Sequence, residues 1–263
     1  MPRSLRSVLP LVAVAAVAGT AFFGVGQATA DHAAPRTDKE IPNLDQVKTK
    51  IEAYYGDIET PDGEHYASPH SNYAEQTRGI AAKARKDLEG DLRKYRSGNG
   101  SKKKPAVVFD VDDTTLLTYN FERRIGYHFT PEAQDEYLRT ENMDPVFGMR
   151  KLVNWADSKG ITVFLVTGRK EYQRDWSVRN LKKVGYKNPV GKDRFFLKNE
   201  EHPPPYLDCG SDCTTVEYKS GTRKHIEDQG YDILANFGDQ YSDLKGGYAN
   251  RKVKLPNPMY YLP

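Results

Sequence analysis

From Pro105 onward, short apolar segments alternate with segments of helical periodicity, and this alternation restricts the possible folds more than any other feature of the chain. Strands are predicted at 106–111, 161–166, 194–197 and 232–237, and helices near 145–159, 171–184 and 216–229. Three of these four strands are almost wholly apolar, as strands covered on both faces are. The pattern therefore predicts an α/β fold with a doubly wound parallel sheet.

Two helical segments precede this region. Apolar stripes predict helices at about 43–55 and 72–95. A polar, glycine-containing stretch at 96–104 marks the boundary with the α/β part. We therefore expect an N-terminal linker and helical region, residues 31–104, that packs on a core formed by residues 105–263.

The first 30 residues have the composition of a secretory signal peptide. Arg3 and Arg6 precede an apolar stretch that ends in Ala28-Thr29-Ala30. A basic start, an apolar middle and an A-x-A end predict cleavage after Ala30 and a secreted protein. An uncleaved membrane anchor is the alternative. Glycine and polar residues interrupt the apolar stretch, however, so no stable membrane anchor is expected after cleavage.

Composition and cysteine content set further bounds. The charged fraction of 29% and the hydrophobic fraction of 38% indicate a soluble globular protein. The net charge of +3 gives no reason to expect a nucleic acid duplex as a partner. The two cysteines, Cys209 and Cys213, can form a short-range disulfide in an exported protein. Free thiols and a metal site are the alternatives, and the metal site is the weakest because two thiols alone do not make a zinc site.

An unusual run of carboxylates follows the first predicted strand. Asp110, Asp112 and Asp113 stand within four positions, directly after the apolar run 106–109. Alternation along an extended chain puts Asp110 and Asp112 on the same side. Their negative charges repel each other, and a chain tolerates this where a cation or a reacting group lies between them. Oxygen-rich clusters suit hard cations such as Mg²⁺.

Further polar residues stand at other ends of predicted strands and helices. Thr167 and Gly168 follow the second strand, Lys219 lies at the start of the last core helix, and Asp239 and Asp243 follow the last strand. Ligands of doubly wound sheets bind at the carboxyl ends of the strands. We therefore expect these residues to meet the first acidic run.

Together these groups can carry out phosphoryl transfer. One carboxylate can attack phosphorus and form an aspartyl-phosphate. A second can protonate the leaving oxygen and then activate water. Lys219, Thr167 and backbone amides can hold the other phosphate oxygens, and a metal would reduce the repulsion between carboxylates.

The segments FDVDDT, VTGR, YKSGTR and GDQYSDL occur in this order and resemble the four motifs of the haloacid dehalogenase (HAD) superfamily. The finer resemblance is to its secreted acid phosphatase branch, with class B-like and plant vegetative-storage-type acid phosphatases. It covers about residues 41–263, including the tail LPNPMYYL. It implies a HAD-like, Rossmannoid core with a short insert after the first strand.

The resemblance also implies residue roles. Asp110 is the nucleophile and Asp112 the general acid/base. The transferred phosphoryl group is bound by Thr167, with Gly168 beside it, and by Lys219. Mg²⁺ is held by Asp110, the backbone carbonyl of Asp112, and Asp239, and Asp243 completes the cluster directly or through water. Arg169, in the second motif, is expected to form a structural ion pair.

The insert at 116–144 lies between the first two motifs, where members of the superfamily can carry a cap. Tyr119 and Phe121 could form a wall over the metal site that favours aromatic or nucleoside monophosphates. Packing of these rings against the N-terminal helices is an equal alternative. The insert ends at Asp144-Pro145, a capping residue followed by proline, so the next helix is expected to begin there.

Three function classes follow. The leading one is a secreted Mg²⁺-dependent phosphomonoesterase acting on small phosphate monoesters. A phosphotransferase that passes the same phosphoryl group to an alcohol is the second, and the sequence does not separate the two. A non-catalytic envelope or storage protein on the same fold is the third, and the intact Asp110 argues against it.

Overall fold

The computed structural model describes residues 35–98 and 100–262, so the predicted signal peptide and its cleavage site lie outside the described residues. Residues 43–263 form one compact unit. Residues 35–42 belong to a second unit and contain a short 3-10 helix at Asp38–Glu40. Among the helices of the described residues, none combines the length and the apolar character needed to cross a bilayer.

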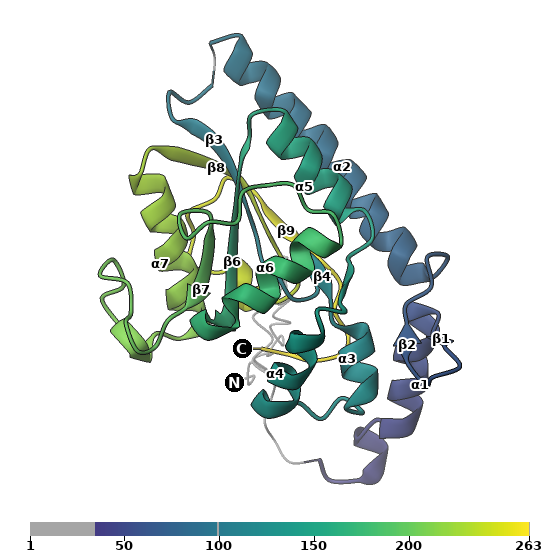
Figure 1. The fold of residues 1–263 in the computed structure, drawn as a ribbon. Helices are drawn as coiled ribbons and strands as arrows, with labels where there is room; N and C mark the ends of the chain where they lie inside the picture. The colour runs from purple at the N-terminus through teal and green to yellow at the C-terminus, as the bar shows by residue number, and fades with distance from the viewer. Residues whose placement is uncertain (1–34, 99, 263) are drawn as a thin grey trace, which may run out of the picture. The chain divides into compact units, whose positions relative to one another are not determined.

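A five-stranded parallel sheet lies at the centre of the larger unit (Figure 1). Its strand order is β7-β6-β3-β8-β9, and every neighbouring pair is parallel. The strands are β3 (Lys104–Phe109), β6 (Thr162–Lys170), β7 (Phe195–Lys198), β8 (Tyr231–Gly238) and β9 (Lys252–Lys254). The predicted parallel α/β fold is thus confirmed. Strand β9 was not predicted, because the sequence Lys-Val-Lys contains no apolar run.

Helices cover both faces of the sheet, as a doubly wound architecture requires. Val107 and Phe109 belong to a buried cluster with residues of α1, α2, α5 and α6. Ala106 and Val108 point to the opposite face and join a cluster with residues of α7. These helices span Leu44–Tyr55 (α1), Asn72–Arg96 (α2), Met149–Ser158 (α5), Arg174–Lys183 (α6) and Thr215–Asp228 (α7).

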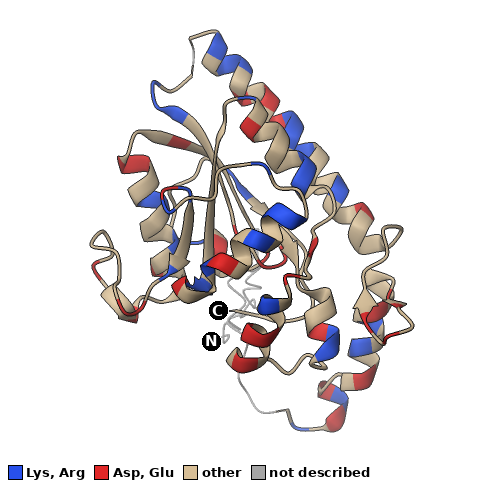
Figure 2. Cartoon of the chain, viewed as in Figure 1, with Lys and Arg blue, Asp and Glu red and all other residues tan. Residues whose placement is uncertain are grey.

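The long helix α2 has a charged exposed side (Figure 2). The side chain of Ser71 caps its first turn. Lys83 and Asp87 form an ion pair one turn apart, 2.8 Å between Nζ and Oδ2. Near the end of the helix, the Tyr95 hydroxyl donates a hydrogen bond to Asp232, which fastens α2 to β8.

A small antiparallel ladder closes the base of the insert. Strand β4 (Leu116–Leu117) pairs with β5 (Asp144–Pro145). The expected helix start at Asp144-Pro145 was wrong, because these residues extend along β4 and α5 begins only at Met149. Gly148 caps α5 with φ +86°, and a Cβ there would lie 3.0 Å from the Cβ of Ala81 in α2.

The other elements are short or lie in the loops. The insert contains α3 and α4, and a two-residue hairpin, β1 with β2, lies between α1 and α2. A single helical turn, α8, follows β8. Their bounds are Tyr119–Arg124 (α3), Pro131–Thr140 (α4), Ile58–Glu59 (β1), His65–Tyr66 (β2) and Tyr241–Leu244 (α8), and two 3-10 turns span Glu171–Gln173 and Gly210–Asp212.

Candidate active site and metal centre

Asp110 lies at the carboxyl end of the central strand β3, and its backbone N–H continues the ladder to the Phe237 carbonyl of β8 at 3.0 Å. Its buried carboxylate is 2.6 Å from Nζ of Lys219, which α7 brings from the neighbouring layer. Burial raises the pKa of Asp110, and the ammonium of Lys219 acts in the opposite direction. The structure therefore pairs the predicted nucleophile with the predicted cation.

Lys219 also donates to Asp243, so one ammonium joins two buried carboxylates. Burial lowers the pKa of Lys219, but Asp110 and Asp243 together raise it above its ordinary value. The neighbouring cations act elsewhere: Arg223 donates to the Asp243 carbonyl at 2.8 Å, and Lys224 pairs with Asp228 on the surface.

Asp239 and Asp243 follow β8 and lie beside Asp110. Asp239 stands directly after the strand, and Asp243 lies in α8. The turn between them depends on Gly238, since a Cβ there would be only 2.3 Å from the Cβ of Asp243. Oδ2 of Asp243 accepts a hydrogen bond from the Gln240 backbone N–H at 2.8 Å, which fixes α8 against the strand end.

Three carboxylates form a cluster that suits a divalent cation. One oxygen each of Asp110, Asp239 and Asp243 lies within 4.8 Å of the others, and all three residues are buried. Burial, followed by the charges of Asp243 and Asp113, raises the pKa of Asp239 to about 7. Hard divalent cations take oxygen ligands, and their charge would offset this repulsion. The donor set therefore fits a hard divalent metal.

The carboxylate of Asp112 does not join this cluster. It receives a two-point ion pair from Arg169, with Nη2 2.6 Å from Oδ1 and Nε 3.0 Å from Oδ2. Arg169 is fully buried and also donates to Ser177 at 2.8 Å. The Asp112 side chain is therefore turned toward β6 and α6, and the atom that the motif resemblance assigns to the metal is its backbone carbonyl.

Asp113 was named in the acidic run but given no role, and the structure buries it completely. Its φ of +52° turns the chain after the nucleophile. The carboxylate accepts hydrogen bonds from the Thr118 backbone N–H at 3.1 Å and the Tyr260 hydroxyl at 2.8 Å. Burial raises its pKa to about 7, although these hydrogen bonds act against the shift.

Thr167 and Gly168 lie on β6, the strand next to β3. Thr167 is buried, and its hydroxyl accepts a hydrogen bond from the Arg169 backbone N–H at 3.2 Å. Gly168 is exposed, and a Cβ there would meet no described atom within 4 Å. The space beside the Gly168 Cα is therefore open at this end of β6.

Tyr119 and Phe121, the predicted substrate wall, are both buried. The Tyr119 ring stacks on Tyr55 of α1 with centroids 4.5 Å apart, and its hydroxyl donates to Asp57 at 2.7 Å. Phe121 packs against Tyr137 of α4. Tyr119 thus packs on the N-terminal helix α1, as the alternative predicted, whereas Phe121 packs within the insert, so protein already covers both rings.

The two cysteines are joined by a disulfide between Cys209 and Cys213, with Cα atoms 5.0 Å apart. The bridge lies in the loop before α7. Thr214, the next residue, caps α7 in a reciprocal capping box with Glu217. The loop that delivers Lys219 therefore carries both a covalent link and a helix cap.

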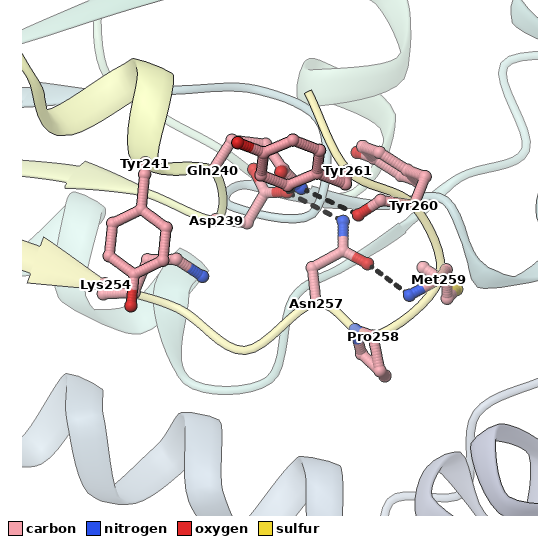
Figure 3. A pocket seen from close by; sticks show the side chains of 9 residues that line it. All are labelled: Asp239, Gln240, Tyr241, Lys254, Asn257, Pro258, Met259, Tyr260 and Tyr261. Carbon is pink, nitrogen blue, oxygen red and sulfur yellow. Dashed lines mark hydrogen bonds between the residues drawn. The ribbon is translucent and has the colours of Figure 1, made fainter. Parts of the chain in front are cut away.

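The segment after β9 was not assigned to the site from the sequence, yet it lies against it. A pocket of about 440 Å³ is bounded by Asp239 on one side and by this segment on the other (Figure 3). Its lining consists of Asp239, Gln240, Tyr241, Lys254, Asn257, Pro258, Met259, Tyr260 and Tyr261. The tail LPNPMYYL was part of the family resemblance, but Asn257 lies far from the motifs in sequence, so its contact with Asp239 could not be predicted.

Residues 26–263 match the sequence profile of a family described as HAD superfamily, subfamily IIIB (acid phosphatase). Plant proteins are among the relatives. Acid phosphatase 1 of Solanum lycopersicum is 34% identical over 159 residues, 59% of this chain and 58% of that protein. The stem 28 kDa glycoprotein of Glycine max is 32% identical over 164 residues, 60% of this chain and 61% of that protein.

Vegetative storage protein 1 of Arabidopsis thaliana is 31% identical over 162 residues, 59% of this chain and 55% of that protein. The matches thus span less than two thirds of the length of each of these relatives. Among solved structures, the class C acid phosphatase from Bacillus anthracis aligns with a TM-score of 0.59 over 83% of this chain and 86% of that one. Their sequence identity is 21%, so this likeness concerns the fold.

Proposed function

Because the chain belongs to the HAD superfamily, subfamily IIIB (acid phosphatase), we propose that it hydrolyses small phosphate monoesters through an aspartyl-phosphate on Asp110. The observation that carries the proposal is the position of the Asp110 carboxylate. It lies at the end of the central strand, 2.6 Å from Lys219 and within the carboxylate cluster of Asp239 and Asp243. A nucleophile, a balancing ammonium and ligands for a cation thus occupy one place.

In the first step, an oxygen of Asp110 attacks phosphorus, so that a new P–O bond forms and the ester P–O bond breaks. Asp112, protonated, gives its proton to the departing oxygen, which leaves as an alcohol. To reach that oxygen, Asp112 must release part of its two-point contact with Arg169. Thr167 and the Gly168 backbone N–H hold the non-bridging phosphate oxygens.

In the second step, water attacks the phosphorus of the aspartyl-phosphate and gives a proton to Asp112. The bond between phosphorus and Asp110 breaks, and inorganic phosphate leaves. Ester and water are thereby converted to alcohol and phosphate, and both carboxyl groups return to their starting states. Lys219 balances the charge of Asp110 before attack and after release.

The metal is the part of the proposal that depends on the acidic cluster. Asp110, Asp239 and Asp243, with the backbone carbonyl of Asp112, would hold Mg²⁺. When bound, the ion supplies positive charge that stabilises the phosphoryl oxygens. The residues themselves provide a site without sulfur or nitrogen ligands, which is the donor chemistry that Mg²⁺ prefers.

The proposal also includes the place of action. With a signal peptide cleaved after Ala30, the secreted chain would meet phosphate esters outside the cell. N-terminal sequencing of the exported protein tests this directly. A mature chain that begins at Asp31 supports cleavage, whereas a chain that keeps Arg3 and Arg6 contradicts it.

The decisive experiment measures phosphate release from p-nitrophenyl phosphate by residues 31–263, with EDTA and then with added Mg²⁺. The matched pair of variants is Asp110→Asn and Asp193→Asn, since the side chain of Asp193 is 77% exposed and far from the motifs in sequence. Activity should require the metal and fall on the order of 10³-fold or more in Asp110→Asn. Activity in Asp110→Asn near that of Asp193→Asn would exclude the covalent mechanism.

The same assay separates the other function classes. Adding glycerol as an acceptor diverts phosphate to glycerol phosphate if the protein acts as a phosphotransferase, and product analysis measures that fraction. The storage alternative is supported by the vegetative storage relative. It predicts no turnover of several monoesters between pH 4 and 9 by a folded protein, even with Mg²⁺ present.

A further inference from the structure

The segment 255–262 contacts the acidic loop after β3 and the acidic loop after β8. Figure 3 shows the contact with Asp239, in the loop after β8. Nδ2 of Asn257 donates a hydrogen bond to Oδ2 of Asp239 at 2.8 Å and lies 3.4 Å from Oδ2 of Asp113. The hydroxyl of Tyr260 reaches the same oxygen of Asp113 at 2.8 Å. Asn257 lies outside all four sequence motifs, so its contact with Asp239 arises only from the fold.

The orientation of the Asn257 amide is determined by its other contact. Its Oδ1 accepts a hydrogen bond from the Met259 backbone N–H at 2.9 Å. The donor end of the amide must therefore face the carboxylates. Pro256 and Pro258 flank the residue, and their fixed φ angles limit how far the backbone can move. Asn257 is thus held in place before any ligand binds.

The two oxygens of Asp239 have unequal surroundings. Oδ2 accepts from Asn257 and also from Nε2 of Gln240 at 2.7 Å. Oδ1 receives one longer contact, 3.3 Å from the Thr114 hydroxyl. Two amide donors on one oxygen fix the carboxylate rotation, and they leave Oδ1 as the oxygen better able to bind a cation.

We propose that Asn257 is a positioning residue for the metal centre, which by holding Oδ2 of Asp239 presents Oδ1 to the cation. The inference rests on the proposed function, in which Asp239 is a ligand. A neutral amide suits this position because it donates to carboxylates without competing for the metal. Outer-shell partners of metal ligands typically change metal affinity by about 10–100-fold when they are removed.

The test is Mg²⁺ binding by isothermal titration calorimetry, with wild type, Asn257→Ala and a matched control, Asn250→Ala. Asn250 also donates its amide to an aspartate, Asp232, at 2.8 Å, but at the other end of β8. The dissociation constant should rise about 10–100-fold in Asn257→Ala and stay at the wild-type value in Asn250→Ala. Thermal unfolding in EDTA shows whether each variant is folded.

If Asn257→Ala does not fold, Asn257→Ser replaces it, because its hydroxyl is too short to reach Asp239 but can still accept from the Met259 N–H. A folded Asn257 variant that binds Mg²⁺ as tightly as wild type overturns the inference while leaving the proposed function intact. Wild type that neither binds Mg²⁺ nor needs it for turnover overturns the inference together with the metal part of the proposed function, and that result is recognised before any variant is compared.

Discussion

Lys219 balances the negative charge of two buried carboxylates at this site. Its ammonium is buried between Asp110 and Asp243, with hydrogen bonds to both. The sequence motifs predicted that Lys219, Asp110, Asp239 and Asp243 belong to one site, and the structure brings them together. Asp113 stood in the first motif without a predicted role, and Asn257 lies outside all four motifs. Their contacts arise where the C-terminal segment folds against the site, and no motif indicated that contact.

We expect Lys219→Met to destabilise the metal-free protein by about 3–5 kcal/mol, because it leaves two buried carboxylates without their cation. Added Mg²⁺ should raise the free energy of unfolding of this variant by more than that of wild type, since the ion then balances the same charges. Urea unfolding with EDTA and with Mg²⁺ measures both effects. Lys224→Met on the same helix is the control, and its free energy of unfolding should stay near that of wild type, because its ion pair with Asp228 is exposed to solvent.

Glu122 gives a pH-dependent prediction that does not involve the acidic cluster. It is buried in α3, and burial, followed by the charge of Asp112, raises its pKa to about 7 from an ordinary value of 4.5. The folded state therefore holds this proton more tightly than the unfolded state does. Its contribution to stability is complete below pH 4.5 and is lost as the pH rises through 7.

We expect wild type to lose up to about 3 kcal/mol relative to Glu122→Gln between pH 5 and pH 8. Urea unfolding of both proteins at the two pH values measures the difference, in which the titration of all other groups cancels. The exposed Glu201→Gln serves as the control and should follow wild type. An equal pH dependence in wild type and Glu122→Gln would contradict the assigned pKa.

At the scale of elements, apolar runs predicted the four longer strands of the sheet and the helices between them, because strands buried on both faces consist mainly of apolar residues. This apolar pattern did not predict two features of the fold. Asp144-Pro145 has the residues of a helix start, but pairing with Leu116-Leu117 holds it extended. Strand β9 has little apolar content, and its place is set by pairing with β8. Tertiary pairing decided both cases.

The disulfide before α7 should make a limited contribution to stability. It closes a loop of five residues, from Cys209 to Cys213, so the chain-entropy estimate is about 2 kcal/mol. The double variant Cys209→Ser/Cys213→Ser should lose no more than this in urea unfolding and should keep the hydrogen bonds of Lys219. Urea unfolding of wild type in a reducing agent is the matching measurement. A loss of activity in the folded double variant would indicate that the disulfide is needed to position Lys219.

At the scale of the whole molecule, the cluster on one face of the sheet is shared between segments from both parts of the chain. Tyr55 of α1 and Leu88 of α2 belong to the same buried cluster as Val107 and Phe109 of β3. We propose that the segment 43–98, which contains α1 and α2, acts as a covering region for the core rather than as an independent domain. The proposal accounts for the apolar stripes of both helices, which need a partner surface.

Residues 105–263 expressed alone should therefore fail to fold. Removing α1 and α2 uncovers one face of the central strand, and such apolar patches lead to aggregation. Circular dichroism and size-exclusion chromatography of this fragment, beside residues 31–263, measure the effect. A monomeric fragment with a cooperative unfolding transition would show that the core does not need its covering helices.

The parallel pairing of the sheet has a consequence for kinetics. Strand β3 finds its neighbours in β6 and β8, which are distant in sequence, and Asp110 and Lys219 are 109 positions apart. Contacts between residues so distant in sequence slow folding, since long loops must close before the strand pairing can stabilise the chain. During refolding from denaturant, recovery of turnover should therefore lag behind the early gain of helix. The time course of enzyme activity would then report when the last long-range contacts have formed.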